Sequence, residues 1–318
     1  MIAAVPRTMR TTDSRFRSIE MPLDRRQILK LAAAAGATAA LPGPGGAEAA
    51  LARPSKDARA VLVDTTNCVG CRSCELACSE ANKLPDPPSD VDFQSLRTTG
   101  PDQFTVVNMA SVKSPGGDDR YAKTQCMHCV EPACASGCVV RALEKKADGP
   151  VIYHADRCLG CRYCMVACPF GVPKYEFTKA VPIVRKCTFC AERQAEGKPP
   201  ACAEACPAGA LTFGKRAELI EEAKKRIYGS PGKYVPRIYG EQEAGGTSWL
   251  YISDVPLESL HLPQNVSNTS YPELADRALS AVPFVITLWP PLLMGLWAMN
   301  KRKEEVAAAG KAGEGRHE

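Results

Sequence analysis

The sequence has few of the residues on which most active sites depend. Only 4 of its 318 residues are histidine and 6% are aromatic, which disfavours a hydrolase built around histidine. The formal net charge of +5 is small for this length, so we expect no nucleic-acid partner. The mature part of the chain has no glycine-rich phosphate loop and no set of nucleophile and base, which disfavours a stand-alone enzyme.

Cysteine, in contrast, is abundant: all 16 cysteines lie between residues 68 and 206, in four groups of four. The groups are Cys68, Cys71, Cys74 and Cys78 (one); Cys126, Cys129, Cys134 and Cys138 (two); Cys158, Cys161, Cys164 and Cys168 (three); and Cys187, Cys190, Cys202 and Cys206 (four). Groups one and three share the spacing C-x2-C-x2-C-x3-C. Their segments CVGCRSCELAC and CLGCRYCMVAC are identical at seven of eleven positions, which indicates an internal repeat.

This spacing has a physical cause in cluster binding. Three cysteines on a tight turn can direct their sulfur atoms at three corners of one cubane 4Fe-4S cluster, and Gly70 or Gly160 permits such a turn. A fourth thiolate three residues farther on points toward a second cluster. The sixteen cysteines therefore predict four 4Fe-4S clusters, with no cysteine left over.

Other uses of the cysteines are disfavoured. Eight disulfides would suit an exported protein, but repeated quartets with C-x2-C pairs are not a disulfide pattern. Zinc sites usually join two separated C-x2-C pairs, which leaves the tight triplet without a role. No C-x2-C pair here is followed by histidine, which excludes c-type haem.

The two ends of the chain carry targeting signals. Residues 1–49 are interpreted as a twin-arginine (Tat) export signal, because Arg25 and Arg26 precede the alanine-rich stretch 31–41 and a small-residue cleavage site after Ala49. Eleven weakly apolar residues extend only ~16 Å as a helix, too short to span a membrane.

A second apolar segment, residues 278–299, has no charged residue. As a helix it would be ~33 Å long, enough to cross a bilayer. A basic triplet begins at Lys301, so the tail 300–318, which we expect to be disordered, lies in the cytoplasm. The alternative is a buried helix of a soluble domain, to which Pro290 and Pro291 give some weight, although membrane helices tolerate proline.

We therefore expect a single-pass protein on the periplasmic side of the bacterial inner membrane. Residues 50–227 are predicted to form the cluster domain, with strands at 61–63 and 151–153, a short helix near 141–144 and a helix at 217–227. Residues 228–277 show no clear periodicity and are interpreted as an extended arm.

These motifs resemble the four-cluster ferredoxin-like subunits of membrane oxidoreductases, and among them the hydrogenase-2 type (HybA-type) electron-transfer subunit. The leader, CMHCVEPAC, CLGCRYCMVACPFGVPKY, CAEACPAGAL and the C-terminal span carry the resemblance over nearly the whole chain. It implies an α+β fold of two nested bacterial-type two-cluster 4Fe-4S ferredoxin-like units, followed by the arm and one C-terminal transmembrane helix.

The resemblance also implies nested pairing of the cysteine groups. Cluster A would be bound by Cys68, Cys71, Cys74 and Cys206; cluster B by Cys187, Cys190, Cys202 and Cys78; cluster C by Cys126, Cys129, Cys134 and Cys168; and cluster D by Cys158, Cys161, Cys164 and Cys138. Spacing alone equally permits pairing of group one with two and of three with four.

In function, the resemblance implies an electron-transfer subunit without catalytic residues. It would relay electrons between a periplasmic catalytic partner, in the first place a NiFe hydrogenase, and a multispan, quinone-linked membrane subunit. The alternative is the same role beside a molybdopterin oxidoreductase or a multihaem cytochrome c. Five side chains lie beside or between the ligands and either tune cluster potentials or serve as surface and packing groups: Arg72, Arg162, Arg185, Lys186 and His128.

Overall fold

A computed structural model gives the fold of residues 58–180 and 182–314. The predicted export signal, residues 1–49, lies outside these described residues. In the described part, short strands and short helices alternate along the chain as far as a C-terminal pair of helices. This confirms the α+β class expected from the sequence.

A three-stranded sheet forms the centre of the fold. Its strands follow the order β8, β1, β9, with the bounds Leu211–Lys215, Arg59–Asp64 and Trp249–Ile252. Strand β1 runs antiparallel to β8 and parallel to β9, so Val61 lies beside both Phe213 and Trp249. The sheet thus joins a strand that precedes all four cysteine groups to two strands that follow them.

Both faces of this sheet are covered by apolar side chains. Helix α7 (Arg216–Gly229) lies against one face, where Leu219 and Ala223 pack with Leu62. On the other face, the fully buried Trp249 belongs to a second apolar cluster. Because both faces are covered, β1 contains a continuous apolar run at residues 60–63 and β9 is apolar at all four positions, without the polar alternation of a half-exposed sheet.

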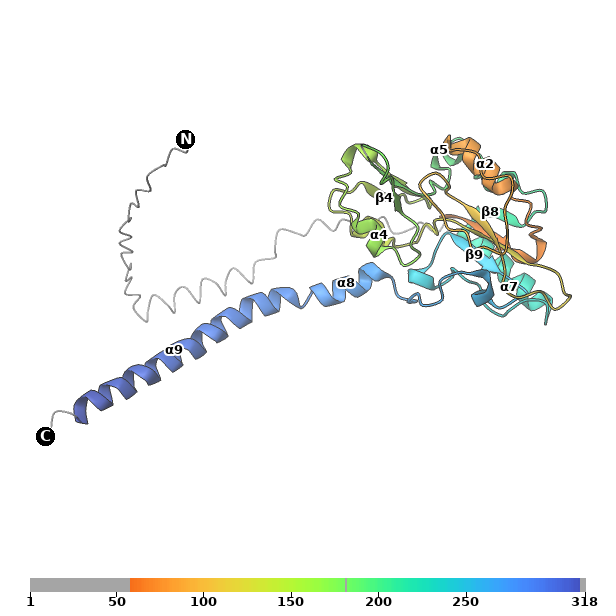
Figure 1. Ribbon diagram of the computed structural model, residues 1–318. Coiled ribbons are helices and arrows are strands. Elements are labelled where there is room, and N and C mark those ends of the chain that lie inside the picture. Colours follow the sequence, from red (N-terminus) through yellow and green to blue (C-terminus); the bar gives the residue numbers. More distant parts are fainter. Residues whose placement is uncertain (1–57, 181, 315–318) are drawn as a thin grey trace, which may run out of the picture. The chain divides into compact units, whose positions relative to one another are not determined.

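Two similar units surround the cysteine groups. Their helices are α2 (Ser73–Asn82), α3 (Ala133–Ser136), α4 (Tyr163–Ala167) and α6 (Ala201–Glu204), and the further strands are β4 (Leu143–Lys145) and β5 (Val151–Tyr153). In the outer unit α2 follows β1 and α6 precedes β8, with the two strands antiparallel. In the inner unit α4 follows β5 and α3 precedes β4, again with antiparallel strands. The inner unit lies between α2 and α6 in sequence (Figure 1).

Small hairpins and turns connect these units. Strand β2 (Val106–Met109) pairs with β3 (Tyr121–Thr124), and β6 (Lys174–Tyr175) pairs with β7 (Val184–Arg185). Helix α5 (Ala191–Ala195) follows β7. The 3-10 turns are η1 (Thr65–Asn67), η2 (Ala155–Arg157), η3 (Glu243–Gly245) and η4 (Leu257–Leu260).

The expectation of an extended arm at residues 228–277 is wrong. Strand β9 lies within this range and is buried at every position. Tyr239 forms an antiparallel bridge with Tyr251, and a Cβ added to Gly240 would lie 2.1 Å from the carbonyl oxygen of Trp249. Strand β9 pairs with the distant strand β1, and such long-range contacts produce no local periodicity from which they could be predicted.

The short helix expected at residues 141–144 is also wrong, because Leu143–Lys145 form strand β4. Leu143 and Lys145 are buried whereas Glu144 is half-buried, which is the two-residue period of a strand. Three other expectations are confirmed by β1, β5 and α7: the strands at residues 61–63 and 151–153 and the helix at 217–227.

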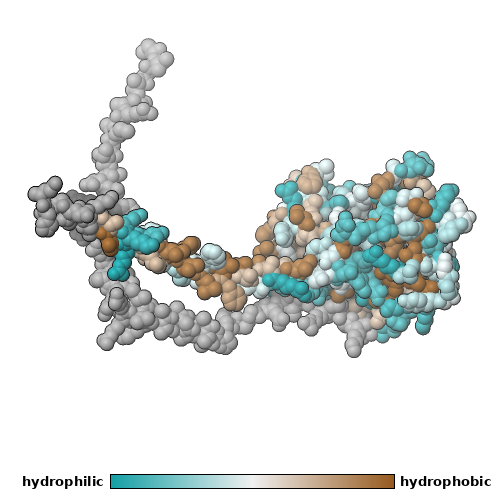
Figure 2. Space-filling view, turned by 90° about the horizontal axis from the view of Figure 1, so that it is seen from below, coloured by the Kyte–Doolittle hydropathy of each residue, from teal (hydrophilic) through white to brown (hydrophobic). Residues whose placement is uncertain are grey.

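Two helices end the described chain, α8 (Tyr271–Leu279) and α9 (Val282–Glu314). The helical stretch Tyr271–Ala307 is long and apolar enough to cross a membrane, and none of its most apolar part is buried. In Figure 2 the hydrophobic side chains form a band along this stretch, with hydrophilic ones at its ends. The tail expected to be disordered from residue 300 is helical as far as Glu314, because NKRKEEVAAA consists largely of strong helix formers.

Candidate metal centres

The repeat in the sequence is also a repeat in backbone conformation. Gly70 and Gly160 have φ values of 70° and 69°. Two residues later, Arg72 and Arg162 have φ values of 62° and 60°. These left-handed residues turn the chain tightly before α2 and α4. A Cβ at Gly70 would lie 2.8 Å from the ring of Tyr121, so glycine is required there for space as well as for conformation.

All sixteen cysteines are free thiols, and only Cys71 and Cys161 are exposed. Burial raises the pKa of Cys78 to about 12 and that of Cys164 to about 11. Such thiols stay protonated at neutral pH unless a metal stabilises the thiolate, because metal binding displaces the proton. A metal bound by these thiols would therefore have to displace their protons, as iron does in a thiolate-ligated cluster.

Thiols of groups one and four meet in a cavity. It is lined by Cys68, Cys71, Cys74 and Cys206, with mostly apolar side chains such as Val63 around them. Burial raises the pKa of Cys68, and the charge of Cys206 raises it further. Four cysteines therefore line one cavity, three from group one and one from group four.

Cys78, the last cysteine of group one, is instead close to group four. Burial raises its pKa, and the neighbouring Cys202 and Cys190 add to that rise. Helices α2 and α6, which carry Cys78 and Cys202, pack against each other. In each of these two groups, the last cysteine therefore lies beside cysteines of the other group.

Groups two and three approach each other in the same way. After burial, Cys138 is the first neighbour to raise the pKa of Cys164, and Cys126 is the first to raise the pKa of Cys168. Helices α3 and α4 are in contact, and Cys134 and Cys164 share one apolar cluster. The structure therefore brings group one beside group four and group two beside group three.

The four sets of thiols also follow one another through the protein. Burial raises the pKa of three buried thiols, and a cysteine of the adjoining set adds to each rise: Cys202 for Cys74, Cys126 for Cys187 and Cys164 for Cys134. These neighbours agree with the order in which the resemblance places the four sets, from A through B and C to D. The two exposed cysteines, Cys71 and Cys161, belong to the first and the last set.

This arrangement fits 4Fe-4S clusters better than single ions. Within residues 58–180 and 182–314, no three histidine, cysteine, aspartate or glutamate side chains converge closely enough to hold one metal ion, as tetrahedral zinc requires. A cubane is wider and takes one thiolate at each of four corners. Sets composed entirely of sulfur ligands also match the ligand preference of iron-sulfur clusters.

Three lysines are buried among these thiols. Lys186 was expected from the sequence to lie beside ligands, but Lys123 and Lys145 were missed. Lys145 lies two residues after the buried Leu143, on the same face of β4, and this two-residue period is the signal that could have revealed it. Lys123 carries no such signal, because its neighbour Ala122 is buried as well.

His128 is fully buried between Cys126 and Cys129. Its Nδ1 accepts a hydrogen bond from the backbone N–H of Val151 at 2.9 Å. Burial holds the pKa of His128 well below its usual value, and the charge of Lys186 lowers it further. The imidazole is therefore neutral at physiological pH.

The arginines expected beside ligands have local partners. Arg72 Nη2 lies 3.0 Å from Glu75 Oε2, and the guanidinium of Arg162 lies 5.7 Å from the centre of the Tyr175 ring. The third arginine is also paired, because Arg185 Nε lies 3.6 Å from Glu176 Oε1. These contacts support a structural role for the arginines.

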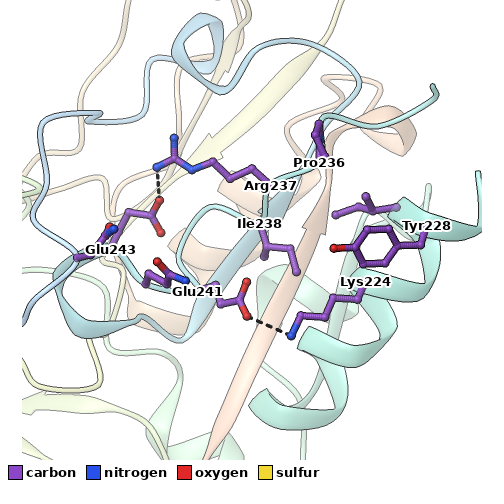
Figure 3. Close-up of a pocket in the computed structure, with 10 residues that line it drawn as sticks. Lys224, Tyr228, Pro236, Arg237, Ile238, Glu241 and Glu243 are labelled. Atoms are coloured by element: carbon purple, nitrogen blue, oxygen red, sulfur yellow. Dashed lines mark hydrogen bonds and ion pairs between the residues drawn. The ribbon is translucent and has the colours of Figure 1, made fainter. Parts of the chain in front are cut away.

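A pocket of about 330 Å³ lies between α7 and residues 236–243 (Figure 3). Two ion pairs occupy its walls: Lys224 Nζ with Glu241 Oε1 at 3.3 Å, and Arg237 Nη2 with Glu243 Oε1 at 2.6 Å. No cysteine lines the pocket. With its charges already paired, it is not a further cluster site.

Comparisons with known proteins identify relatives of the chain. The family of the 4Fe-4S dicluster domain matches residues 118–216, and the twin-arginine translocation pathway signal sequence matches residues 22–42. A protein of Nitratidesulfovibrio vulgaris strain Hildenborough is 47% identical over 300 residues, which cover 91% of this chain and 80% of the relative.

Two further relatives have descriptive names. The hydrogenase-2 operon protein HybA of Escherichia coli O157:H7 is 38% identical over 278 residues, covering 76% of this chain and 84% of HybA. The iron-sulfur subunit of the nitrate-inducible formate dehydrogenase of Escherichia coli K12 is 31% identical over 248 residues, covering 72% of this chain and 81% of that subunit. All these matches include the cysteine-rich part of the chain or its leader.

Proposed function

The chain belongs to the family of 4Fe-4S iron-sulfur subunits that includes HybA and the formate dehydrogenase iron-sulfur subunits, and we propose that it relays electrons through four such clusters. The relay connects a periplasmic catalytic partner with a quinone-linked membrane subunit. One observation carries the proposal: all sixteen cysteines are free thiols gathered into four adjoining sets.

In this proposal each set takes three cysteines from one group and one from another. Cluster A is bound by Cys68, Cys71, Cys74 and Cys206; B by Cys187, Cys190, Cys202 and Cys78; C by Cys126, Cys129, Cys134 and Cys168; and D by Cys158, Cys161, Cys164 and Cys138. The cavity shared by group one and Cys206 supports this nested pairing, as does the position of Cys138 next to Cys164. The same contacts disfavour pairing of group one with two.

The protein supplies binding and insulation rather than bond-making chemistry. A bound 4Fe-4S cluster exchanges one electron at a time. The thiolates would hold the iron, and the left-handed turns at Gly70 and Gly160 aim them. Apolar side chains such as Val63 and Val107 line part of the space between the thiols of the first set. Because the four sets adjoin one another and the outermost two include exposed cysteines, the chain offers a path from one surface to another.

We propose a NiFe hydrogenase as the catalytic partner. The support is the resemblance to the hydrogenase-2 type, in which an export leader and a C-terminal span occur on the same cluster-binding chain, together with 38% identity to HybA. A molybdopterin oxidoreductase is the second candidate, because a formate dehydrogenase subunit is 31% identical.

The proposed location is the periplasmic side of the bacterial inner membrane, with α9 as a single membrane anchor. The match of the Tat signal to residues 22–42 supports export of the folded chain. The basic residues Lys301, Arg302 and Lys303 follow the apolar part of α9, which favours a cytoplasmic C-terminus.

Purification of the tagged chain from membranes tests this proposal. We expect a hydrogenase large subunit and a multispan membrane protein to co-purify, and hydrogen gas to bleach the cluster absorbance of the complex. Bleaching by formate but not by hydrogen would favour the molybdopterin partner. A chain that contains iron but is reduced by neither, with no catalytic subunit attached, would contradict the proposed role.

A further inference from the structure

Three ammonium groups are buried in the part of the protein that holds the thiols. Lys123, Lys145 and Lys186 are 3%, 5% and 5% exposed. A buried cation is unfavourable unless an opposite charge accompanies it. Among the described residues, no carboxylate lies within ion-pair distance of any of the three.

Lys123 lies where the sets of clusters A and B adjoin. Its Nζ donates a hydrogen bond to Gln125 Oε1 at 2.9 Å and lies 4.4 Å from the centre of the Trp249 ring. Burial lowers the pKa of Lys123, but the charges of Cys202 and Cys74 more than offset this and raise it overall. Lys123 also lines the cavity that contains Cys68, Cys71, Cys74 and Cys206, which places its ammonium group beside the cysteines of this set.

Lys145 lies beside the set of cluster C. Its Nζ donates to the backbone carbonyls of His128 at 3.1 Å and Gly149 at 2.5 Å. Burial lowers its pKa to about 8, opposed by the charges of Cys129 and Cys126. Because His128 lies between Cys126 and Cys129, the hydrogen bond to its carbonyl holds the ammonium of Lys145 beside this set.

Lys186 lies between the sets of clusters B and C. Its Nζ donates to the backbone carbonyl of Val151 and, at 3.1 Å, to that of Cys187. Burial raises the pKa of Cys134 in the next set, and the charge of Lys186 lowers it. The hydrogen bond to Cys187 and the effect on Cys134 place this lysine between the two adjoining sets.

A four-thiolate cluster carries net negative charge that grows by one unit on reduction. A positive charge nearby favours the more negative, reduced form and raises the reduction potential. Inside a protein this interaction is strong and weakly screened by salt, because the surroundings have a low dielectric constant. The negative charge of the clusters would also serve as the counter-charge of the three ammonium groups, which have no carboxylate partner.

We propose that Lys123, Lys145 and Lys186 are built-in counter-charges of the inner part of the relay, and that they raise the reduction potentials of the clusters they adjoin. The inference rests on the proposed role of the chain as carrier of four clusters. It assigns the lysines a tuning role rather than a ligating one. Cluster D serves as an internal reference, because none of the three lysines is among the main causes that shift the pKa of its ligand Cys164.

The test is a redox titration followed by electron paramagnetic resonance on the membrane complex. Lys145→Met removes the charge and keeps the length of the side chain. Lys146→Met is its matched control, because the side chain of the neighbouring Lys146 is 44% exposed and pairs with Glu144. We expect the midpoint potential of one cluster to become more negative in Lys145→Met, while cluster D and all clusters of Lys146→Met are unchanged. Lys123→Met and Lys186→Met provide independent repeats at the other two positions.

Iron content separates failure of this inference from failure of the proposed function. If parent and variants hold full iron but no potential moves, the lysines are structural and the inference is overturned. If a methionine variant loses a cluster that Lys145→Arg retains, the positive charge is needed for the cluster and the inference stands. Loss of the cluster in both variants would assign the lysine to packing and overturn it. A parent chain without clusters would instead refute the proposed function.

Discussion

The imidazole of His128 stacks on the ring of Phe189, with centroids 4.9 Å apart and planes 23° apart. Each residue directly precedes the second cysteine of a C-x2-C pair, His128 in group two and Phe189 in group four. Both have left-handed backbones, with φ values of 46° and 57°. Two equivalent turns, one from the inner unit and one from the outer, therefore meet ring to ring.

Replacement of Phe189 by alanine should remove the ring stacking between the inner and outer units and lower the thermal stability of the cluster domain. Phe189 is 1% exposed and also contacts the ring of Trp249; a buried Phe→Ala change costs about 3–5 kcal/mol. The temperature at which heating bleaches the clusters should fall clearly. Phe177→Ala is the control, because Phe177 is exposed and its loss should have little effect. Equal bleaching temperatures for the two variants would show that the stack does not join the units.

Gly70→Ala should impair the first set of thiols. The backbone at Gly70 is left-handed and a Cβ would meet the Tyr121 ring at 2.8 Å, so alanine would shift the turn that carries Cys68 and Cys71. We expect the iron content to fall by about a quarter, the share of one cluster in four. Gly100→Ala, where nothing lies within 4 Å of the new Cβ, should keep all iron. Full iron in both variants would argue against a constrained turn.

Cys138→Ser distinguishes the two possible pairings. In the nested arrangement, Cys138 completes the cluster held by Cys158, Cys161 and Cys164. Its proximity to this set is supported by its effect on Cys164, whose pKa is raised by burial and then by Cys138. The resonance signal of that cluster should change or disappear, while the cluster of group one remains. Loss of the cluster bound by Cys68 would instead support pairing of group one with group two.

Removal of α9 should release the chain from membranes. The apolar side chains of α9 are exposed, for example Phe284 at 67% and Trp297 at 65%, so they contribute nothing to the core of the cluster domain. When expressed without partner subunits, a chain ending at Ser280 should remain in the soluble fraction with the iron content of the parent. A truncated chain that still requires detergent would place the membrane contact elsewhere.

The features predicted correctly from the sequence are those with local causes. The left-handed turn at Gly70 follows from the tight cysteine spacing, and helix α7 follows from apolar residues at helical intervals. The apolar part of α9 requires only a run of uncharged residues. Each of these depends on neighbours within a few positions.

The features that escaped prediction depend on contacts between distant segments. Strand β9 pairs with β1, and apolar clusters cover it on both faces of the sheet. All four of its residues are therefore buried and apolar, and its sequence lacks the alternation of a half-exposed strand. Lys123 looks like a surface residue by composition, yet Trp249 and the thiols enclose it. The local sequence of a buried lysine does not show which distant charge accompanies it.

The most direct test of the four-cluster relay is a metal and electron count on the purified chain. Iron and acid-labile sulfide are measured per polypeptide, and the electrons taken up are counted in a reductive titration. We predict about sixteen iron and sixteen sulfide atoms and an uptake of about four electrons, one for each cluster. About eight iron atoms, or zinc in place of iron, would contradict the assignment of all sixteen cysteines to four 4Fe-4S clusters.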